Sequence, residues 1–270
     1  MQKTILITGS TDGIGLETAK ALYSQGHQVL LHGRNPSKLE MAEKALLALP
    51  GRGRVESYLA DLSSMAEVEG LAQAIGESHS QIDVLINNAG ILRTADTITN
   101  DGMDIRFAVN TFAPYILTQR LLPLLGPDAR VVNLSSAAQS PVNLEALAGH
   151  TRITDDLNAY AQSKLALTIW SSSMAHSQGD KGPVIVAINP GSLLATKMVK
   201  EGFGMAGKDI NIGRDILIRA ALSDEFTDAS GKYFDNDAGR FASPHPDALD
   251  AMKSEKVVRA IEAVLANRRH

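Results

Sequence analysis

The chain has 270 residues, 44% of them hydrophobic, with a net charge of -4 and a pI near 6.0. This length and composition suit one α/β domain with a sizeable core and exclude a largely disordered chain. Because Lys and Arg form no long block, nucleic acid is a poor candidate partner.

Cysteine and histidine usage narrows the class further. The sequence has no Cys, so disulfides and thiolate sites are excluded. Its 7 His are scattered, and the zinc pattern HExxH does not occur. No apolar run approaches the ~18 residues that span a bilayer, and the first residues are typical of a strand rather than a signal peptide. We expect a cytoplasmic protein with no metal and no membrane partner.

Short apolar runs alternate with helical patterns along the chain. Strands are expected at residues 4–7, 28–31, 54–59, 82–86, 130–134, 183–188 and 231–234. Helices are expected at about residues 16–24, 37–50, 63–75, 102–125, 156–177, 212–222 and 247–266, with Ser37 and either Ser63 or Ser64 as N-caps. Runs rich in Ile, Val and Leu are typical of strands buried on both faces. The pattern predicts one α/β domain over residues 1–270, a doubly wound, mostly parallel sheet of about seven strands with helices on both faces.

Two connections are longer than usual. Residues 137–155 separate the fifth strand from its helix, and residues 193–211 follow the sixth strand. Long loops at the carboxyl ends of parallel strands are where ligands bind, so we interpret the first as an insertion and the second as a substrate lid. Ordinary surface loops are the alternative. Apolar residues in these segments are expected to line a substrate pocket, or else to pack within the loops: Val142, Leu144, Leu147, Met198, Phe203 and Met205.

A glycine-rich turn follows the first strand. Gly9 lets the chain turn sharply, Gly13 lets the backbone approach a pyrophosphate, and Gly15 lets the helix pack closely on the sheet. The helix N-terminus then directs unpaired N–H groups at the phosphates. A purely structural turn is the alternative. The predicted phosphate site consists of Gly9, Ser10, Thr11, Asp12, Gly13, Ile14 and Gly15.

The end of the second strand bears on the choice of dinucleotide. Asp or Glu here would suit the ribose of NAD, whereas Arg34, followed by Asn35, suits a 2′-phosphate. After the third strand, Asp61 and its neighbour Leu62 are expected near the adenine, although a helix cap explains Asp61 equally well. We therefore predict NADP(H) as the preferred cofactor, with NAD(H) possible.

Tyr160 and Lys164 are four residues apart on an expected helix and so share one face. A cation near a phenol favours the phenolate, so the pair is typical of general acid–base chemistry. On its own the spacing more often reflects a core Tyr and a surface Lys. Other polar or small residues lie at strand ends or in the long helix: Asn87, Asn88, Ala89, Gly90, Asn110, Ser135, Ser136, Pro190, Gly191 and Thr196.

The motifs TGxxxGxG, NNAG, YxxxK and PG, in this order, make the chain resemble the short-chain dehydrogenase/reductase family over about residues 3–235. The resemblance implies a Rossmann-type sheet and hydride transfer between a nicotinamide and a carbonyl or alcohol carbon. It implies Tyr160 as the acid–base residue, with Lys164 binding the nicotinamide ribose and lowering the pKa of Tyr160. Ser136 would hydrogen-bond the substrate oxygen, with Ser135 as the rival, and Asn110 would hold a water in a proton relay.

The same resemblance implies further cofactor contacts. Asn87, Asn88, Ala89, Gly90, Pro190 and Gly191 would line the cofactor, Thr196 would contact the carboxamide, and Thr8 would support the glycine loop. The long gap between Ser136 and Tyr160 is similar to an insertion in retinol-dehydrogenase-like and related carbonyl reductases.

These observations predict an NADP(H)-dependent reductase of a small-molecule ketone or aldehyde, reversible as an alcohol dehydrogenase. An NADPH-binding sensor with little turnover is the alternative. The helices at residues 102–125 and 156–177 are apolar around much of their circumference. Such surplus apolar surface suggests a homodimer, unless the insertion covers it and leaves a monomer.

Overall fold

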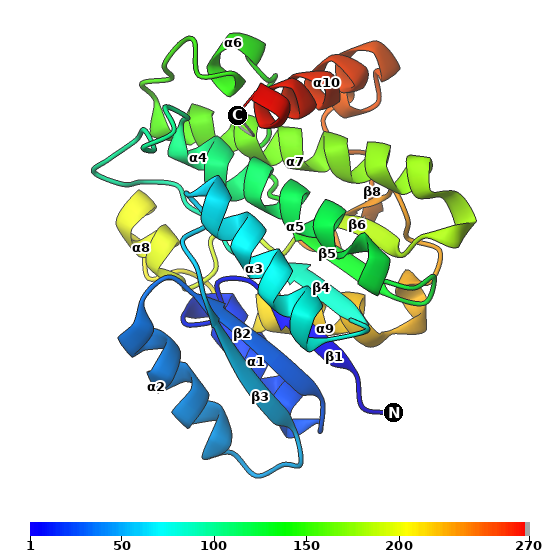
Figure 1. Cartoon of the computed structure of the whole chain (residues 1–270). Coiled ribbons are helices and arrows are strands. Elements are labelled where there is room, and N and C mark those ends of the chain that lie inside the picture. Colours follow the sequence, from blue (N-terminus) through cyan, green and yellow to red (C-terminus); the bar gives the residue numbers. More distant parts are fainter. Residues whose placement is uncertain (268–270) are drawn as a thin grey trace.

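The computed structural model describes residues 1–267, except for the side chain of Phe203. Within this range eight strands form one sheet in the order β3-β2-β1-β4-β5-β6-β7-β8 (Figure 1). The strands are β1 (Thr4–Ile7), β2 (Gln28–Gly33), β3 (Arg54–Leu59), β4 (Val84–Asn87), β5 (Arg130–Leu134), β6 (Val184–Asn189), β7 (Tyr233–Asp235) and β8 (Arg240–Ala242). The first seven run parallel, and β8 folds back antiparallel on β7. The predicted doubly wound sheet is confirmed, with β8 as an additional strand.

The α-helices cover both faces of this sheet (Figure 1). They are α1 (Gly13–Ser24), α2 (Pro36–Leu47), α3 (Met65–Ser78), α4 (Ile105–Phe107), α5 (Ala113–Leu121), α6 (Leu144–Leu147), α7 (Asp156–Gln178), α8 (Lys197–Phe203), α9 (Asn211–Leu222) and α10 (Ala251–Asn267). Strand side chains alternate between two cores. Ile5 and Ile7 of β1 join the core that includes α1, α2 and α9, whereas Leu6 joins the core of α3, α5, α7 and α10. Burial on both faces explains why the strands are continuous apolar runs.

Two helix starts are decided by capping side chains. Asn35 caps α2 by accepting a hydrogen bond from Lys38 N at 3.0 Å. The predicted cap Ser37 lies inside the helix instead, because Pro36 takes the first helical position, where its missing N–H costs nothing. Ser64, one of the two predicted candidates, caps α3.

The long helix predicted over residues 102–125 is interrupted. Asp104 starts α4 by accepting from Arg106 N at 2.9 Å, and a π-helical turn at Ala108–Phe112 leads into α5. Such turns are frequent at functional sites, and this one contains Asn110. The sequence pattern did not reveal it because the apolar residues continue through the turn.

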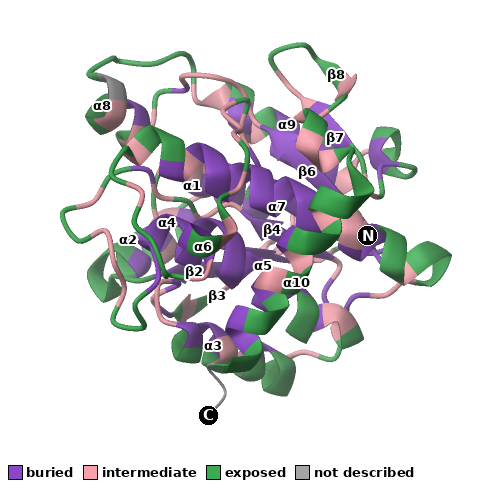
Figure 2. Cartoon of the chain, turned by 90° about the horizontal axis from the view of Figure 1, so that it is seen from above, coloured by how far each residue is buried: buried purple, intermediate pink, exposed green. Residues whose placement is uncertain are grey.

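The chain itself covers the apolar circumference of α7. Val257 and Ile261 of α10 are buried in the same core as Leu165 and Trp170 of α7, and Leu147 of the insertion joins them. Figure 2 shows α7 buried beneath more exposed elements. These apolar residues of α7 are therefore buried within one chain, whereas Leu157 in its first turn is 45% exposed. None of the helices in residues 1–267 combines the length and apolar composition that crossing a lipid bilayer requires.

Candidate active site

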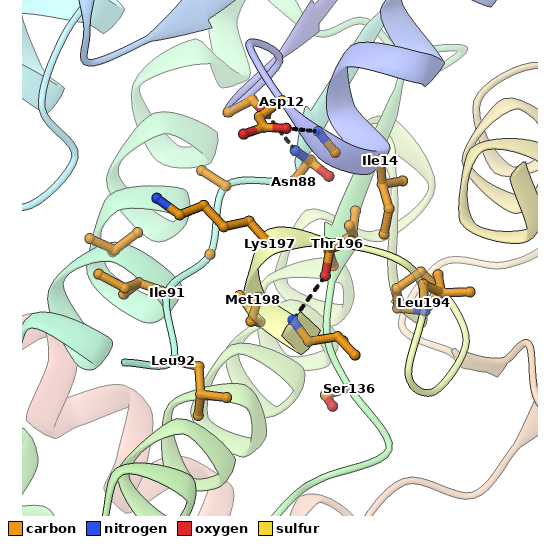
Figure 3. A pocket seen from close by; sticks show the side chains of 18 of the residues that line it. Asp12, Ile14, Asn88, Ile91, Leu92, Ser136, Leu194, Thr196, Lys197 and Met198 are labelled. Carbon is orange, nitrogen blue, oxygen red and sulfur yellow. Dashed lines mark hydrogen bonds between the residues drawn. The ribbon is translucent and has the colours of Figure 1, made fainter. Parts of the chain in front are cut away.

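A cavity of about 680 Å³, here called the main cavity, opens at the carboxyl ends of the central strands (Figure 3). Residues after β2 and residues after β5 both line it, and these strands are separated by β1 and β4 in the sheet order. Because neighbouring strands lie about 4.8 Å apart, the two sets of residues are on the order of 14 Å from each other. The main cavity therefore suits an extended ligand laid across the sheet.

The glycine loop between β1 and α1 is packed against the loop after β4. Gly9 has a φ of 64°, and a Cβ there would lie 2.9 Å from the Ala89 Cα. A Cβ on Gly15 would lie 2.4 Å from Asn88 Nδ2. Larger residues at these two glycines would displace the loop, so its close approach to the strand ends depends on their lacking a side chain.

Hydrogen bonds hold this loop in place. Asn88 Nδ2 donates to the carbonyl oxygens of Thr8 and Gly9 at 2.9 and 3.0 Å, and Ala89 N donates to Thr8 Oγ1 at 3.1 Å. Thr8 thus joins the start of the glycine loop to the loop after β4. Ser10 is buried, and its Oγ accepts from His32 N at 2.9 Å, so its hydroxyl supports the loop from behind rather than lining the cavity.

His32 is a residue that the sequence did not single out as functional. Its Nδ1 accepts from Gly9 N at 3.1 Å, and its Nε2 lies 3.1 Å from the Ala60 carbonyl oxygen. Burial lowers its pKa to about 4, so the ring is neutral near pH 7, with Nε2–H as the donor to Ala60. A neutral histidine between β1 and β3 therefore fixes the amide at the start of the glycine loop.

Two cations line the main cavity beyond β2. Arg34 is exposed there, and Lys38 in the first turn of α2 joins it with its Nζ 3.4 Å from Asp12 Oδ2. Lys38 was not predicted to be a site residue. It follows Arg34 by four residues, but Arg34 lies before the N-cap Asn35 and thus outside α2, so helix spacing did not link the two. Asn35, that N-cap, does not line the cavity.

Asp61 and Leu62 also line the main cavity after β3. Asp61 Oδ1 accepts from the backbone N and hydroxyl of Ser63 at 2.9 and 2.8 Å. This carboxylate therefore forms a local turn before α3, while the helix cap itself is Ser64. The helix-cap alternative for Asp61 is therefore wrong, and the contact with an adenine stays a prediction.

Lys164 and Tyr160 of α7 line the main cavity next to Ser136. Lys164 is only 3% exposed, and its Nζ donates to the Leu134 carbonyl oxygen at 2.7 Å. The same Nζ lies 5.6 Å from the centroid of the Tyr160 ring. Burial lowers the pKa of Lys164 to about 7.

The phenol of Tyr160 differs from the expectation. Burial raises its pKa, and a hydrogen bond with Ser136 only partly opposes this effect. The resemblance implied a pKa lowered by Lys164. In the structure the ammonium is anchored on the strand end instead, and its own charge is weakened by burial. The protein alone therefore keeps the phenol protonated near neutral pH.

The two serines after β5 have different surroundings. Ser135 is 3% exposed, and its Oγ lies 2.6 Å from Thr168 Oγ1. Ser136 is more exposed, its Oγ accepts from Ala138 N at 3.0 Å, and its carbonyl oxygen accepts from Tyr233 OH at 3.1 Å. Ser136 is thus the serine whose hydroxyl meets Tyr160, whereas that of Ser135 is engaged by α7.

Asn110 is completely buried and does not line the main cavity. Its Oδ1 accepts from Ile91 N at 2.8 Å, and its Nδ2 donates to Ile91 O and Ser163 Oγ, both at 2.9 Å. The amide thus joins the loop after β4 to α7 and has its groups engaged there. A water held by this side chain, as the resemblance implied, would have to share these contacts. Asn87, the last residue of β4, does not line the cavity either. Its Nδ2 donates hydrogen bonds to Asn133 Oδ1 and Thr118 Oγ1.

The segment after β6 closes another side of the main cavity. Pro190, Gly191 and Thr196 line it, and Thr196 Oγ1 accepts from Val199 N at 3.2 Å to cap α8 (Figure 3). Lys197, which was not among the predicted site residues, also lines it. From the β7–β8 hairpin, Asn236 Nδ2 donates to Pro190 O at 2.9 Å.

Most of the apolar residues predicted to form a substrate pocket lie elsewhere. Met198 lines the main cavity, but Leu147 is buried in the core, Val142 and Leu144 pack against it, and Met205 is 50% exposed outside the lining. Phe203 has its side chain outside the described part. The insertion folds into α6 and packs toward α7 and α10, so its apolar residues cover helices. The apolar residues that do line the cavity include Ile91, Leu92, Val109, Leu157, Leu193 and Leu194.

Within residues 1–267, no group of three or more His, Asp or Glu side chains is placed to hold a metal ion. Together, residues of the glycine loop, Asn88 after β4 and the Tyr160–Lys164 pair line one cavity. Residues 3–205 match the family model for short chain dehydrogenases. The chain belongs to the short-chain dehydrogenase family.

Members of this family with known sequences or structures cover most of the chain. Retinol dehydrogenase 13 of Mus musculus is 30% identical over 277 residues, covering 96% of this chain and 81% of the relative. An uncharacterised protein from Mycobacterium Paratuberculosis superposes with a TM-score of 0.80 at 28% identity, covering 97% of this chain and 93% of that one. A short chain dehydrogenase from Shigella flexneri 2a str. 301, complexed with NADP, has a TM-score of 0.68 at 27% identity over 87% of this chain and 97% of that one. These relatives confirm that the chain belongs to a family of oxidoreductases and to its retinol-dehydrogenase-like branch.

Proposed function

We propose that this short-chain dehydrogenase is an NADP(H)-dependent carbonyl reductase that also runs in reverse as an alcohol dehydrogenase. The observation that carries the proposal is the composition of one cavity. It is lined by a buried ammonium, a phenol and a serine hydroxyl after β5, and by two cations after β2. Apolar side chains such as Leu92 and Met198 complete the lining near the first set, which favours an uncharged substrate.

The residues present fit a dinucleotide. Gly9 and Gly13 have positive φ angles of 64° and 59° and line the main cavity, and a Cβ on Gly13 would come within 3.8 Å of Thr196 Cγ2. The N-terminus of α1 therefore faces the cavity, where its N–H groups can bind phosphates. Arg34 and Lys38 would hold a 2′-phosphate, and no acidic residue stands at the end of β2 to favour NAD. The relative from Shigella flexneri complexed with NADP supports the same preference. NAD(H) would bind more weakly, without the phosphate contact.

When bound, the nicotinamide supplies or accepts the hydride. The Ser136 hydroxyl and the Tyr160 phenol donate hydrogen bonds to the carbonyl oxygen and so polarise it. Tyr160 then gives its proton to the alkoxide oxygen, which requires the protonated phenol that burial favours. The Lys164 ammonium over the ring stabilises the phenolate left behind.

The first test measures NADPH oxidation by the wild-type protein with a panel of apolar ketones, aldehydes and quinones. Replacing Tyr160 by Phe should lower kcat by about 10²–10⁴-fold, the usual contribution of a positioned proton donor, while NADPH still binds. Tyr58→Phe is the matched control, because Tyr58 lies on β3 and does not line the main cavity. Near-normal turnover of Tyr160→Phe would remove the proposed acid. Tight NADPH binding with no turnover across the panel would favour the sensor instead.

A further inference from the structure

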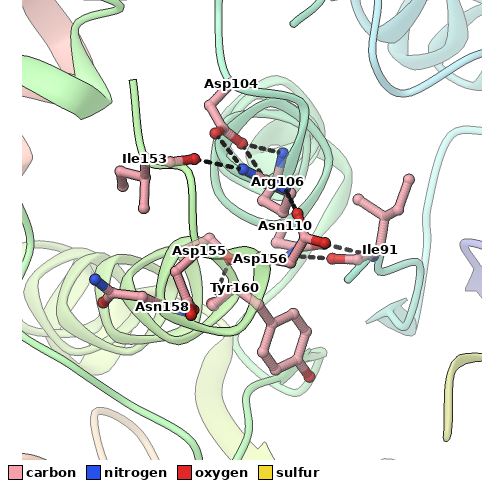
Figure 4. Close-up of polar contacts among 10 residues, drawn as sticks. Ile91, Asp104, Arg106, Asn110, Ile153, Asp155, Asp156, Asn158 and Tyr160 are labelled. Atoms are coloured by element: carbon pink, nitrogen blue, oxygen red, sulfur yellow. Dashed lines mark hydrogen bonds and ion pairs between the residues drawn. The ribbon is translucent and has the colours of Figure 1, made fainter. Parts of the chain in front are cut away.

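Arg106 of α4 is completely buried, and hydrogen bonds engage every nitrogen of its guanidinium (Figure 4). Its Nε and Nη2 donate to the two carboxylate oxygens of Asp104, both at 2.7 Å. Its Nη1 donates to Asp156 Oδ1 at 2.6 Å, and its Nη2 also reaches the Ile153 carbonyl oxygen at 3.3 Å. One side chain therefore joins the start of α4, the end of the insertion and the first turn of α7.

Stability alone is a weak reason for such a cluster. Removing charged groups from water is costly, and apolar residues of similar volume often replace a buried ion pair at no loss of stability. A forked guanidinium differs from an apolar side chain in its fixed geometry, because it donates hydrogen bonds only in its plane and in set directions. What Arg106 adds to packing is the relative placement of the three segments.

The cluster lies one helical turn from Tyr160, because Asp156 precedes Tyr160 by four residues on α7. Residues four apart on an α-helix share a face, about 6 Å from each other. On the other side of the cluster, Arg106 lies in α4, which directly precedes the π-helical turn that contains Asn110. Asn110 Nδ2 and Thr111 Oγ1 meet Ser163 Oγ and O, both at 2.9 Å. Two levels of polar contact thus join the same two elements, which fixes both the rotation and the axial position of α7.

Asp156 is not needed to start its helix. Asp155 caps α7 by accepting from Asn158 N at 2.6 Å. The Asp156 carboxylate instead points sideways, with Oδ1 on Arg106 and Oδ2 3.7 Å from Arg93 Nε. Arg93 in turn donates to the Glu201 carbonyl oxygen in α8 at 3.4 Å. The contacts of Asp156 are therefore between segments rather than within α7.

We propose that Arg106, acting through Asp156, is a positioning residue for the reaction, because it holds the first turn of α7 and thereby the Tyr160 phenol in the main cavity. The proposal rests on the proposed function, in which Tyr160 is the acid. It assigns no contact between Arg106 and substrate or cofactor. Its consequence is that loss of the pair affects the proton transfer step and leaves dinucleotide binding at the glycine loop intact.

Two substitutions at Asp156 separate position from charge. Asp156→Asn keeps an oxygen that accepts from Arg106, whereas Asp156→Ala removes it. We expect kcat of Asp156→Ala to fall by about 10–100-fold, since a misplacement of ~1 Å has an effect of this size. Asp156→Asn should stay close to the wild type in kcat. In both variants the Kd for NADPH should be unchanged.

Arg106→Lys keeps the charge but not the fork, so it should behave as Asp156→Ala does. Arg120→Lys is its matched control, because Arg120 makes a forked pair with Glu69 between α5 and α3, away from α7. If Arg106→Lys does not fold, the Asp156 pair still decides the question. A second readout is the ionisation of Tyr160, followed by ultraviolet difference absorbance against Tyr160→Phe. Asp156→Ala should move its pKa, and Asp156→Asn should not.

Several results would overturn the positioning role. One is a wild-type kcat in Asp156→Ala, and another is an equal loss in Asp156→Ala and Asp156→Asn. Parallel losses of kcat, NADPH affinity and melting temperature would assign a structural role only. A wild-type protein without turnover would refute the proposed function, and the Tyr160 titration would then still show whether the pair fixes the phenol.

Discussion

The Lys164 ammonium is held by the Leu134 carbonyl oxygen at 2.7 Å, at the carboxyl end of β5. This bond ties α7 to the sheet and places the cation over the Tyr160 ring rather than on the phenol oxygen. At this position burial lowers the pKa of Lys164 to about 7. The Tyr160 phenol stays protonated because the effect of burial on its pKa outweighs that of its hydrogen bond with Ser136.

The buried Lys164 should cost stability in a pH-dependent way. Its folded-state pKa of about 7 lies below the ordinary value of 10.5, so the unfolded chain binds more protons between these values. The penalty is therefore full below pH 7 and disappears as the pH rises to about 10.5. Lys164→Met should raise the melting temperature relative to the wild type more at pH 6 than at pH 10. A difference that is independent of pH would contradict this account; thermal melts at both pH values measure it.

The raised pKa of Tyr160 should separate the two reaction directions. In the proposed mechanism, reduction would use the protonated phenol and should continue to alkaline pH, whereas alcohol oxidation would need the phenolate and should rise with pH. Because the Ser136 hydrogen bond lowers the phenol pKa, Ser136→Ala should move the oxidation profile to higher pH. Profiles of kcat against pH in both directions measure this. A shift of the Ser136→Ala profile to lower pH would be inconsistent with the hydrogen bond.

Arg34 and Lys38 should determine the preference for the phosphorylated dinucleotide. A hydrogen bond to a charged group contributes about 1.5–3 kcal/mol, so Arg34→Ala should raise KM for NADPH by roughly 10–100-fold. KM for NADH should change little, and Lys38→Ala should act in the same direction. Lys44→Ala is the control, since Lys44 is exposed on α2, pairs with Glu40 and does not line the main cavity. Equal effects on both dinucleotides would argue against a 2′-phosphate contact.

Two glycines should respond to alanine with opposite signs. Gly9 has φ 64° and would bring a Cβ to 2.9 Å from backbone, so Gly9→Ala should destabilise the fold by about 1–3 kcal/mol and weaken NADPH binding. Gly70 lies inside α3 with open space around it. Gly70→Ala should therefore stabilise the protein by about 0.5–1 kcal/mol without affecting NADPH. Chemical unfolding and fluorescence titration distinguish the two, and similar behaviour of both variants would refute the argument.

Much of the fold and part of the site could be predicted from the sequence because they depend on local constraints. A run such as residues 4–7 must be buried on both faces, so it predicts a strand of a covered parallel sheet. The turn from Gly9 to Gly15 needs positive φ angles and close packing, which limits the residues that can occupy it. The spacing of Tyr160 and Lys164 places them on one helix face wherever that helix lies. The family resemblance rested on these local patterns, and the comparisons confirm it.

Other features depend on segments that meet only in the folded chain. Nothing near His32 indicates that its ring holds the Gly9 amide, and nothing near Arg106 indicates a partner fifty residues away on α7. The predicted pocket role of Leu147 failed because its apolar side chain fits a helix interface as well as a cavity. Composition and periodicity state which side chains avoid water and which backbone turns are allowed. Only the tertiary structure decides which buried partner each side chain meets, because that choice is set by packing across the sheet and not by neighbours along the chain.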